Sequence, residues 1–161
     1  MNAEKNINVR VTRRFAASPE PVFDAWLNPE KARRFLFATE SGQMTRVEID
    51  PRVGGSFIFV DRRDGEDIEH TGKYLEIDQP LLLVFTLSVG KYSSNEGRVI
   101  IEIAPLRGGC ELVITHVGVQ PEYASRTETG WTAILETLAG TLGEGSGPMA
   151  GASAEKKEES R

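Results

Sequence analysis

The feature that most constrains the fold is a long amphipathic pattern near the C-terminal end, over residues 122–142. Large apolar side chains recur there at intervals of three and four residues, which places them along one face of an α-helix. Gly143 follows directly, as glycine often does where a helix ends. Gly130 lowers the helix propensity within the pattern and predicts a close approach by a neighbouring element. The side chains of the apolar face are Trp131, Ile134, Leu135, Leu138 and Leu142.

A helix with one apolar face needs a surface to cover, and the preceding sequence predicts a β-sheet. Residues 6–16 alternate polar and apolar side chains and predict a first strand. Two short helices are expected next, with Ser18 and Asn28 as N-caps and Pro19 and Pro29 in the first turns. The second of these helices includes Phe35 and Leu36 on its apolar side.

The alternation of period two then returns and predicts six more strands before the long helix. One begins at Gln43, one contains Phe57 and Phe59, and four cover residues 68–78, 81–88, 97–104 and 110–117. The sequence Arg63-Asp64-Gly65-Glu66 predicts a hairpin turn. This order predicts an α+β fold in which a curved antiparallel sheet of about seven strands wraps around the long C-terminal helix. Because a straight helix cannot fill a curved surface, a cavity between the two layers is expected.

The length and composition indicate one domain. The chain has 161 residues, of which 39% are hydrophobic, enough for one core over residues 1–143. Residues 144–161 have almost nothing to bury and are predicted to be a disordered tail. Cys110 is the only cysteine, so no internal disulfide can form, and a small buried side chain is expected at that position.

Charge and motif content exclude several functional classes. The net charge is −5 and there is no basic cluster, which argues against nucleic acid as a partner. No apolar run approaches about 18 residues, and the N-terminus lacks a signal-peptide pattern, so we expect a cytoplasmic protein without a membrane span. The two histidines, His70 and His116, have no ligand spacing that would assemble a metal site. No glycine-rich phosphate loop is present, and we expect no cofactor.

Five segments together resemble a known family: residues 18–26, 53–57, 83–86, 110–116 and 130–138. In this order and spacing they are similar to the family named for the activator of Hsp90 ATPase homologue, within the START or Bet v 1-like superfamily. The resemblance implies a helix-grip fold, in which the sheet wraps the C-terminal helix and encloses an apolar cavity. The sequence departs from the common pattern at Arg34-Phe35-Leu36, where members often have Arg-Trp-Phe, and at Cys110, where they often have Thr.

The candidate ligand contacts are mostly apolar or aromatic residues of the predicted sheet and helices. His116 shares the inward face of its strand with Leu112. It could act as a general base or polarise a carbonyl, although a structural or ligand-orienting role is the simpler interpretation. The facing of Tyr74 and Arg98 is open at this stage, and the aromatic residues could equally be core. The candidates are Trp26, Phe35, Phe57, Phe59, Tyr74, Phe85, Arg98, Leu112, His116 and Trp131.

Three functions are compatible with these features. The leading hypothesis is a non-catalytic protein that binds a hydrophobic or amphipathic small molecule between the sheet and the C-terminal helix. The second, implied by the resemblance, is a stress-related or co-chaperone-like module with a protein partner. The third is an enzyme of the cyclase, dehydratase or hydrolase type found in the superfamily, for which only His116, Tyr74 and Arg98 offer polar groups. Monomer and homodimer both remain open.

Overall fold

A seven-stranded sheet and three α-helices make up the computed structural model, which describes residues 6–37, 42–90 and 97–142. The predicted tail over residues 144–161 lies outside the described part. The elements, in chain order, are β1 (Ile7–Phe15), α1 (Pro19–Leu27), α2 (Pro29–Phe35), β2 (Gln43–Ile49), β3 (Ser56–Arg63), β4 (Glu66–Asp78), β5 (Leu82–Val89), β6 (Gly97–Leu106), β7 (Gly109–Val119), a 3-10 helix η2 (Pro121–Tyr123) and α3 (Ala124–Thr141).

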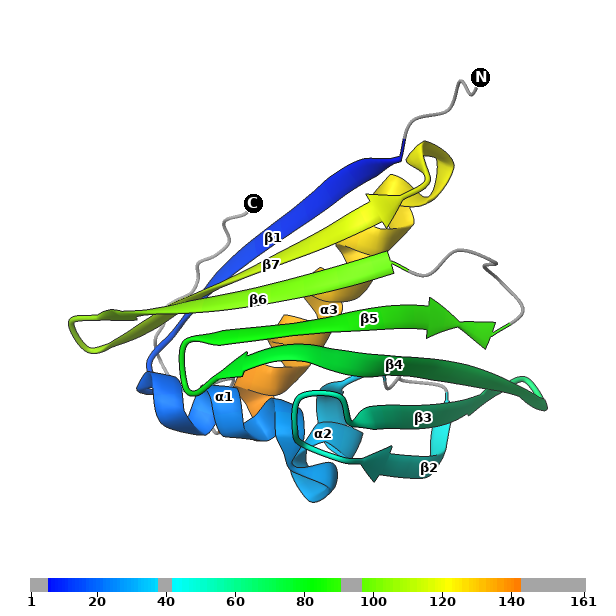
Figure 1. Cartoon of the computed structure of the whole chain (residues 1–161), viewed down its shortest axis with the longest axis horizontal. Helices are drawn as coiled ribbons and strands as arrows, with labels where there is room; N and C mark the ends of the chain where they lie inside the picture. The colour runs from blue at the N-terminus through cyan, green and yellow to red at the C-terminus, as the bar shows by residue number, and fades with distance from the viewer. Residues whose placement is uncertain (1–5, 38–41, 91–96, 143–161) are drawn as a thin grey trace.

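The strands form one antiparallel sheet in the order β1-β7-β6-β5-β4-β3-β2. Strands β2 to β7 follow one another as a meander, and the last of them, β7, pairs with β1 from the start of the chain. Figure 1 shows α3 running across one face of this sheet, with α1 and α2 close to one end of α3. The structure confirms the predicted α+β helix-grip fold, including the two short helices after the first strand.

Local sequence signals account for several of the element boundaries. The Asn28 side chain accepts hydrogen bonds from the backbone N–H groups of Glu30 and Lys31, at 2.9 and 3.2 Å, and so begins α2 as predicted. Ser18 holds the N-cap position of α1 but makes no capping bond through its side chain. Asp64 and Gly65 have φ values of 51° and 77° and form the tight turn between β3 and β4.

Strand β4 contains a bulge that explains why its facing is ambiguous in the sequence. The pairing of β4 with β5 shifts register between Tyr74 and Glu76, so Leu75 is an extra residue. Before the bulge, Ile68, His70 and Tyr74 all face the interior and are buried. After it the alternation changes phase, and Leu75 is left 44% exposed on the outer side.

Helix α3 packs against β1, β7 and α2, with Trp131, Leu135 and Leu138 buried. The predicted helix began at residue 122, whereas residues 121–123 form the separate 3-10 turn η2. The expected close approach at Gly130 is wrong: Gly130 is exposed, and a Cβ atom built there would have no neighbour within 4 Å. No helix in the described ranges has both the length and the apolarity to cross a membrane.

Candidate functional site

The space between the sheet and the helices is occupied by a group of packed rings that we call the interior aromatic cluster. It draws side chains from α1, α2, α3 and strands β3 to β5. Every member is at most 6% exposed. Neighbouring rings lie at distances typical of aromatic packing, such as 5.1 Å between the centroids of Trp26 and Phe35 and 5.4 Å between those of Phe57 and Phe85. The members are Trp26, Phe35, Phe37, Phe57, Phe59, His70, Tyr74, Phe85 and Trp131.

Phe37 connects the helix side of this cluster to its sheet side. Its ring stacks on His70 of β4, with centroids 4.4 Å apart and planes 13° from parallel. It meets Phe59 edge-on at 5.4 Å and lies 6.0 Å from Trp131 of α3. Phe37 itself belongs to no helix or strand, because α2 ends at Phe35.

A polar contact lies at another part of the same interface, where Trp131 Nε1 donates a hydrogen bond of 3.0 Å to His116 Nδ1. Burial lowers the pKa of His116 to about 4, so the ring is neutral at pH 7. Nδ1 must therefore be the acceptor, and the proton resides on Nε2. Gly97 on β6 leaves room for this ring, since a Cβ atom there would lie 2.8 Å from His116 Nε2.

His70 is the more deeply buried of the two histidines and is only 5% exposed. Burial lowers its pKa to about 4, and the nearby Arg63 charge adds to the effect. Hydrogen bonding of the ring to the backbone of Phe59 and Ile68, and the charge of Asp61, act in the opposite direction. His70 is therefore a neutral ring at pH 7 whose flat face is covered by Phe37.

Two polar atoms of the cluster are buried without a hydrogen bond of normal geometry to any described residue. They are Trp26 Nε1 and His70 Nδ1. Trp26 is 1% exposed, so solvent does not reach its N–H group. Buried polar atoms in native proteins are nearly always paired, and each exception calls for an explanation.

The structure brings together most of the candidate residues predicted from the sequence. Seven of them are members of the cluster, and Leu112 is buried on the inward face of β7. His116 faces inward, as predicted, and contacts Trp131. Arg98 is exposed on the outer side of β6, next to the buried Val99, and does not reach the cluster. The seven are Trp26, Phe35, Phe57, Phe59, Tyr74, Phe85 and Trp131.

The three polar residues considered for catalysis do not converge. Strands β5 and β6 separate Tyr74 on β4 from His116 on β7, a lateral distance of about 14 Å at normal strand spacing. Arg98 lies on the opposite face from both. Burial and the charge of Asp50 raise the pKa of Tyr74, so its hydroxyl is a neutral group at any physiological pH. This arrangement lacks the mutual contact that an acid–base pair requires.

Sequence reasoning missed His70 and Phe37. His70 shares its parity with Ile68 and Tyr74, and that alternation was available, but the bulge at Leu75 obscured it. Phe37 follows a helix and lies outside any periodic segment, so only its apolar character marked it as buried.

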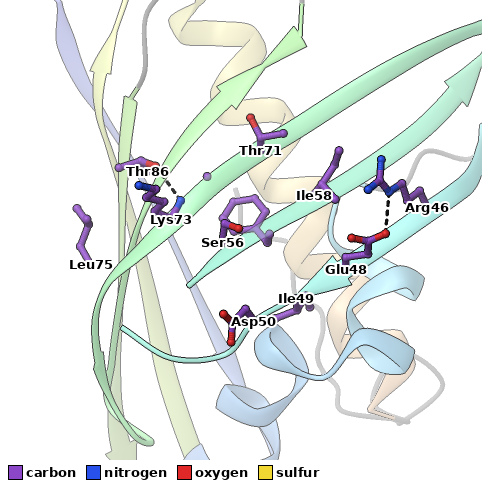
Figure 2. A pocket seen from close by; sticks show the side chains of 12 residues that line it. Arg46, Glu48, Ile49, Asp50, Ser56, Ile58, Thr71, Lys73, Leu75 and Thr86 are labelled. Atoms are coloured by element: carbon purple, nitrogen blue, oxygen red, sulfur yellow. Dashed lines mark hydrogen bonds and ion pairs between the residues drawn. The ribbon is translucent and has the colours of Figure 1, made fainter. Parts of the chain in front are cut away.

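A hollow of about 880 Å³ lies on the outer face of β2 to β5 and shares only Phe57 with the cluster. Figure 2 shows Leu75, Lys73 and Thr86 on one side of it and Arg46 and Glu48 on the other. Arg46 Nε and Glu48 Oε2 form an exposed ion pair at 2.8 Å. The lining therefore mixes apolar and charged groups. It also includes Ile49, Asp50, Ser56, Phe57, Ile58, Thr71 and Gly72.

Within the described ranges, no group of three or more His, Cys, Asp or Glu side chains is arranged to hold a metal ion. Cys110 is buried, as expected for a small side chain in the core. These observations direct attention to the aromatic cluster and the outer hollow.

Comparison with known proteins agrees with this architecture. Protein CV1439 from Chromobacterium violaceum is 27% identical, with a TM-score of 0.78, over 85% of this chain and 96% of that one. A Rhodobacter sphaeroides protein is 23% identical, with a TM-score of 0.74, over 88% and 96%. Protein SA2116 from Staphylococcus aureus, described as of unknown function, is 16% identical, with a TM-score of 0.77, over 88% and 96%.

Curated protein sequences give no match to the chain. Residues 16–143, however, match the family described as Activator of Hsp90 ATPase homolog 1-like protein. Since this match includes most of the sequence and all of the elements from α1 to α3, the chain belongs to that family.

Proposed function

We propose that this protein binds a small apolar or amphipathic molecule between the sheet and α3, in contact with the interior aromatic cluster. The observation that carries the proposal is the pair of buried polar atoms, Trp26 Nε1 and His70 Nδ1, that find no hydrogen-bond partner among the described residues. Leaving such groups unpaired costs about 1–3 kcal/mol each. A ligand with a polar atom among apolar ones would offset this cost. A core that binds no ligand would avoid the cost by having apolar side chains at these two positions.

The chemistry of the cluster favours an uncharged ligand. Its walls are aromatic rings, and both histidines are neutral at pH 7 because burial lowers each pKa to about 4. A charged molecule would lose its hydration without gaining a charged partner from these rings. Apolar area, with one or two hydrogen bonds for orientation, is the usual composition of a small-molecule site.

A titration with 1-naphthol tests this proposal. We expect saturable binding with one molecule per chain, quenching of tryptophan fluorescence in proportion to occupancy, and a negative heat-capacity change from apolar burial. Leu112→Trp, which enlarges a fully buried side chain on the inward face of β7, should weaken binding strongly. Circular dichroism and denaturant unfolding establish that this variant is folded.

The matched control is Thr71→Trp, which places a large ring in the outer hollow and leaves the inward face unchanged. It should bind 1-naphthol as the wild type does. No saturable binding in the wild type, or binding that is lost in Thr71→Trp and kept in Leu112→Trp, would contradict the interior site.

The outer hollow supports a second candidate function, a protein interaction of the co-chaperone-like type suggested by the family. Leu75 is 44% exposed at one edge of the hollow, Ile58 lies across from it, and the charged side chains of Arg46, Glu48 and Lys73 also line the surface. An apolar centre with a polar rim is the usual anatomy of a protein interface. Thr71→Trp should then weaken binding to a protein partner while leaving the 1-naphthol titration unchanged.

A further inference from the structure

We infer that Phe37 is a plug whose ring occupies the position of the ligand's own ring, and that the ligand is an uncharged planar aromatic molecule with a hydroxyl or carbonyl group directed at His70. The inference rests on the proposed function and narrows it to a ligand class and a subsite. It is carried by the backbone of Phe37, the shape of the space around its ring, and the unpaired atom next to it.

The backbone of Phe37 is in a conformation that a bulky side chain rarely adopts. Its φ is 61°, in the left-handed region that glycine occupies without steric cost. The other non-glycine residue with positive φ in the described ranges is Asp64, in the β3–β4 turn, where the chain reversal requires it. At Phe37 it directly follows the C-cap residue of α2, a position where the turn that ends a helix commonly takes a left-handed residue, usually glycine. The packing of one ring therefore offsets the backbone strain.

The space that this ring fills has the shape of a flat slot. One wall is the face of His70, 4.4 Å from the Phe37 centroid and nearly parallel to it. Phe59 closes the slot edge-on, and Trp131 lies on the α3 side at 6.0 Å. If Phe37 turns outward, a planar ring can make the same stacked and edge contacts, which aromatic pairs favour.

The chemistry of His70 adds a polar requirement to this slot. Phe37 has no polar side-chain atom, so it covers the imidazole without pairing Nδ1, which is buried and has no hydrogen-bond partner among the described residues. A hydroxyl or carbonyl group at the edge of a stacked ligand could reach that in-plane nitrogen. Since burial keeps His70 neutral at pH 7, the imidazole offers one donor and one acceptor nitrogen and no charge. A phenol-like or aryl-carbonyl ligand matches this better than a hydrocarbon or an anion.

A plug lowers affinity in a way that can be measured. When only a fraction of molecules has the slot open, the apparent dissociation constant rises by the inverse of that fraction. Phe37→Gly removes the ring and also suits the positive φ, so the variant should bind 1-naphthol at least about tenfold more tightly than the wild type. The matched control is Phe85→Ala, which removes a buried ring of the cluster that makes no ring contact with His70.

The ligand class is tested by adding His70→Phe to Phe37→Gly. The His70→Phe substitution keeps a flat ring as the wall of the slot and removes the imidazole nitrogen atoms. Affinity for 1-naphthol should fall by about fivefold, the change expected from the loss of one ordinary hydrogen bond. Affinity for naphthalene, which has no polar group, should not change. Equal changes for the two probes would overturn the assignment of the hydroxyl to His70.

The outcomes separate this inference from the proposed function. Wild-type binding that Phe37→Gly leaves unchanged, or that Phe85→Ala strengthens equally, overturns the plug and leaves the interior site in place. Binding by Phe37→Gly without any binding by the wild type would mean that the substitution itself created the cavity, and would overturn both the plug and the proposed function. Failure of both proteins to bind overturns both.

Discussion

At the scale of single residues, the hydrogen bond from Trp131 to His116 joins α3 to β7 and fixes the tautomer of the histidine. The sequence correctly predicted the inward facing of His116, because its strand alternates without interruption from Cys110. It did not predict that Trp131 is the partner of His116. The contacts between helix residues and strand residues depend on how α3 crosses the sheet, and the sequence pattern does not give that crossing. Arg98 shows the same limit, since its strand was predicted but its exposed side was not.

The two histidines of the interior face, His70 buried and His116 partly buried, should make folding stability depend on pH. Each has a pKa of about 4 in the folded state, below the ordinary value of 6.5. The unfolded chain therefore binds more protons between these values, so their contribution is present above pH 6.5 and is lost as the pH falls toward 4. Between pH 7 and pH 5, each histidine should lower the free energy of unfolding by about 2 kcal/mol.

Urea unfolding of the wild type and His116→Gln at both pH values measures this contribution. Glutamine keeps a hydrogen-bonding group for Trp131 but does not titrate. The variant should lose about 2 kcal/mol less than the wild type over the same range. An identical loss in both proteins would show that His116 is not held neutral by burial.

Substitution of Trp131 separates its packing from its hydrogen bond. Trp131→Ala should lower the free energy of unfolding by about 3–5 kcal/mol, because a nearly fully buried ring is removed. Trp131→Phe keeps an aromatic ring but leaves His116 Nδ1 without its donor. The loss of this hydrogen bond should lower the free energy of unfolding by about 1–3 kcal/mol, in addition to the effect of the smaller ring. Denaturant unfolding gives both values, and a loss below 1 kcal/mol for Trp131→Ala would mean that the ring is not part of the core.

At the scale of elements, periodicity predicted the order and type of the strands and helices, but local irregularities escaped it. The bulge at Leu75 reverses the alternation within β4, so no single phase describes the strand. Gly130 was expected at a close contact, yet it lies one turn before Ile134, which is itself only partly buried. A helical pattern gives the direction of the buried face but not its width.

Glycine substitutions test this description of the elements. Gly130→Ala and Gly140→Ala should each stabilise α3 by up to about 1 kcal/mol, because both glycines lie within the helix and a Cβ atom meets no neighbour within 4 Å. Gly72→Ala should be strongly destabilising, since a Cβ atom in β4 would collide with the Thr86 carbonyl and the Phe57 ring. Thermal unfolding of the three variants checks the signs, and a gain in melting temperature for Gly72→Ala would contradict the strand packing.

At the scale of the whole molecule, the helix-grip architecture was predictable because seven strand patterns and one long amphipathic helix leave few alternatives. How far the space between the layers is filled was not predictable. That volume depends on the curvature of the sheet and on Phe37, whose residue type says nothing about its backbone conformation. The outer hollow was also not anticipated, because its depth depends on how four consecutive strands curve, which the alternation of residues does not give.

The central claim, that a ligand binds inside the fold, is tested most directly by intermolecular nuclear Overhauser effects from bound 1-naphthol. The account predicts contacts from the probe to the ring protons of His70 and Trp131, on the inward side of the sheet. Contacts confined to Ile58, Leu75 and Thr71, on the outer face, would contradict it and would assign binding to the hollow shown in Figure 2.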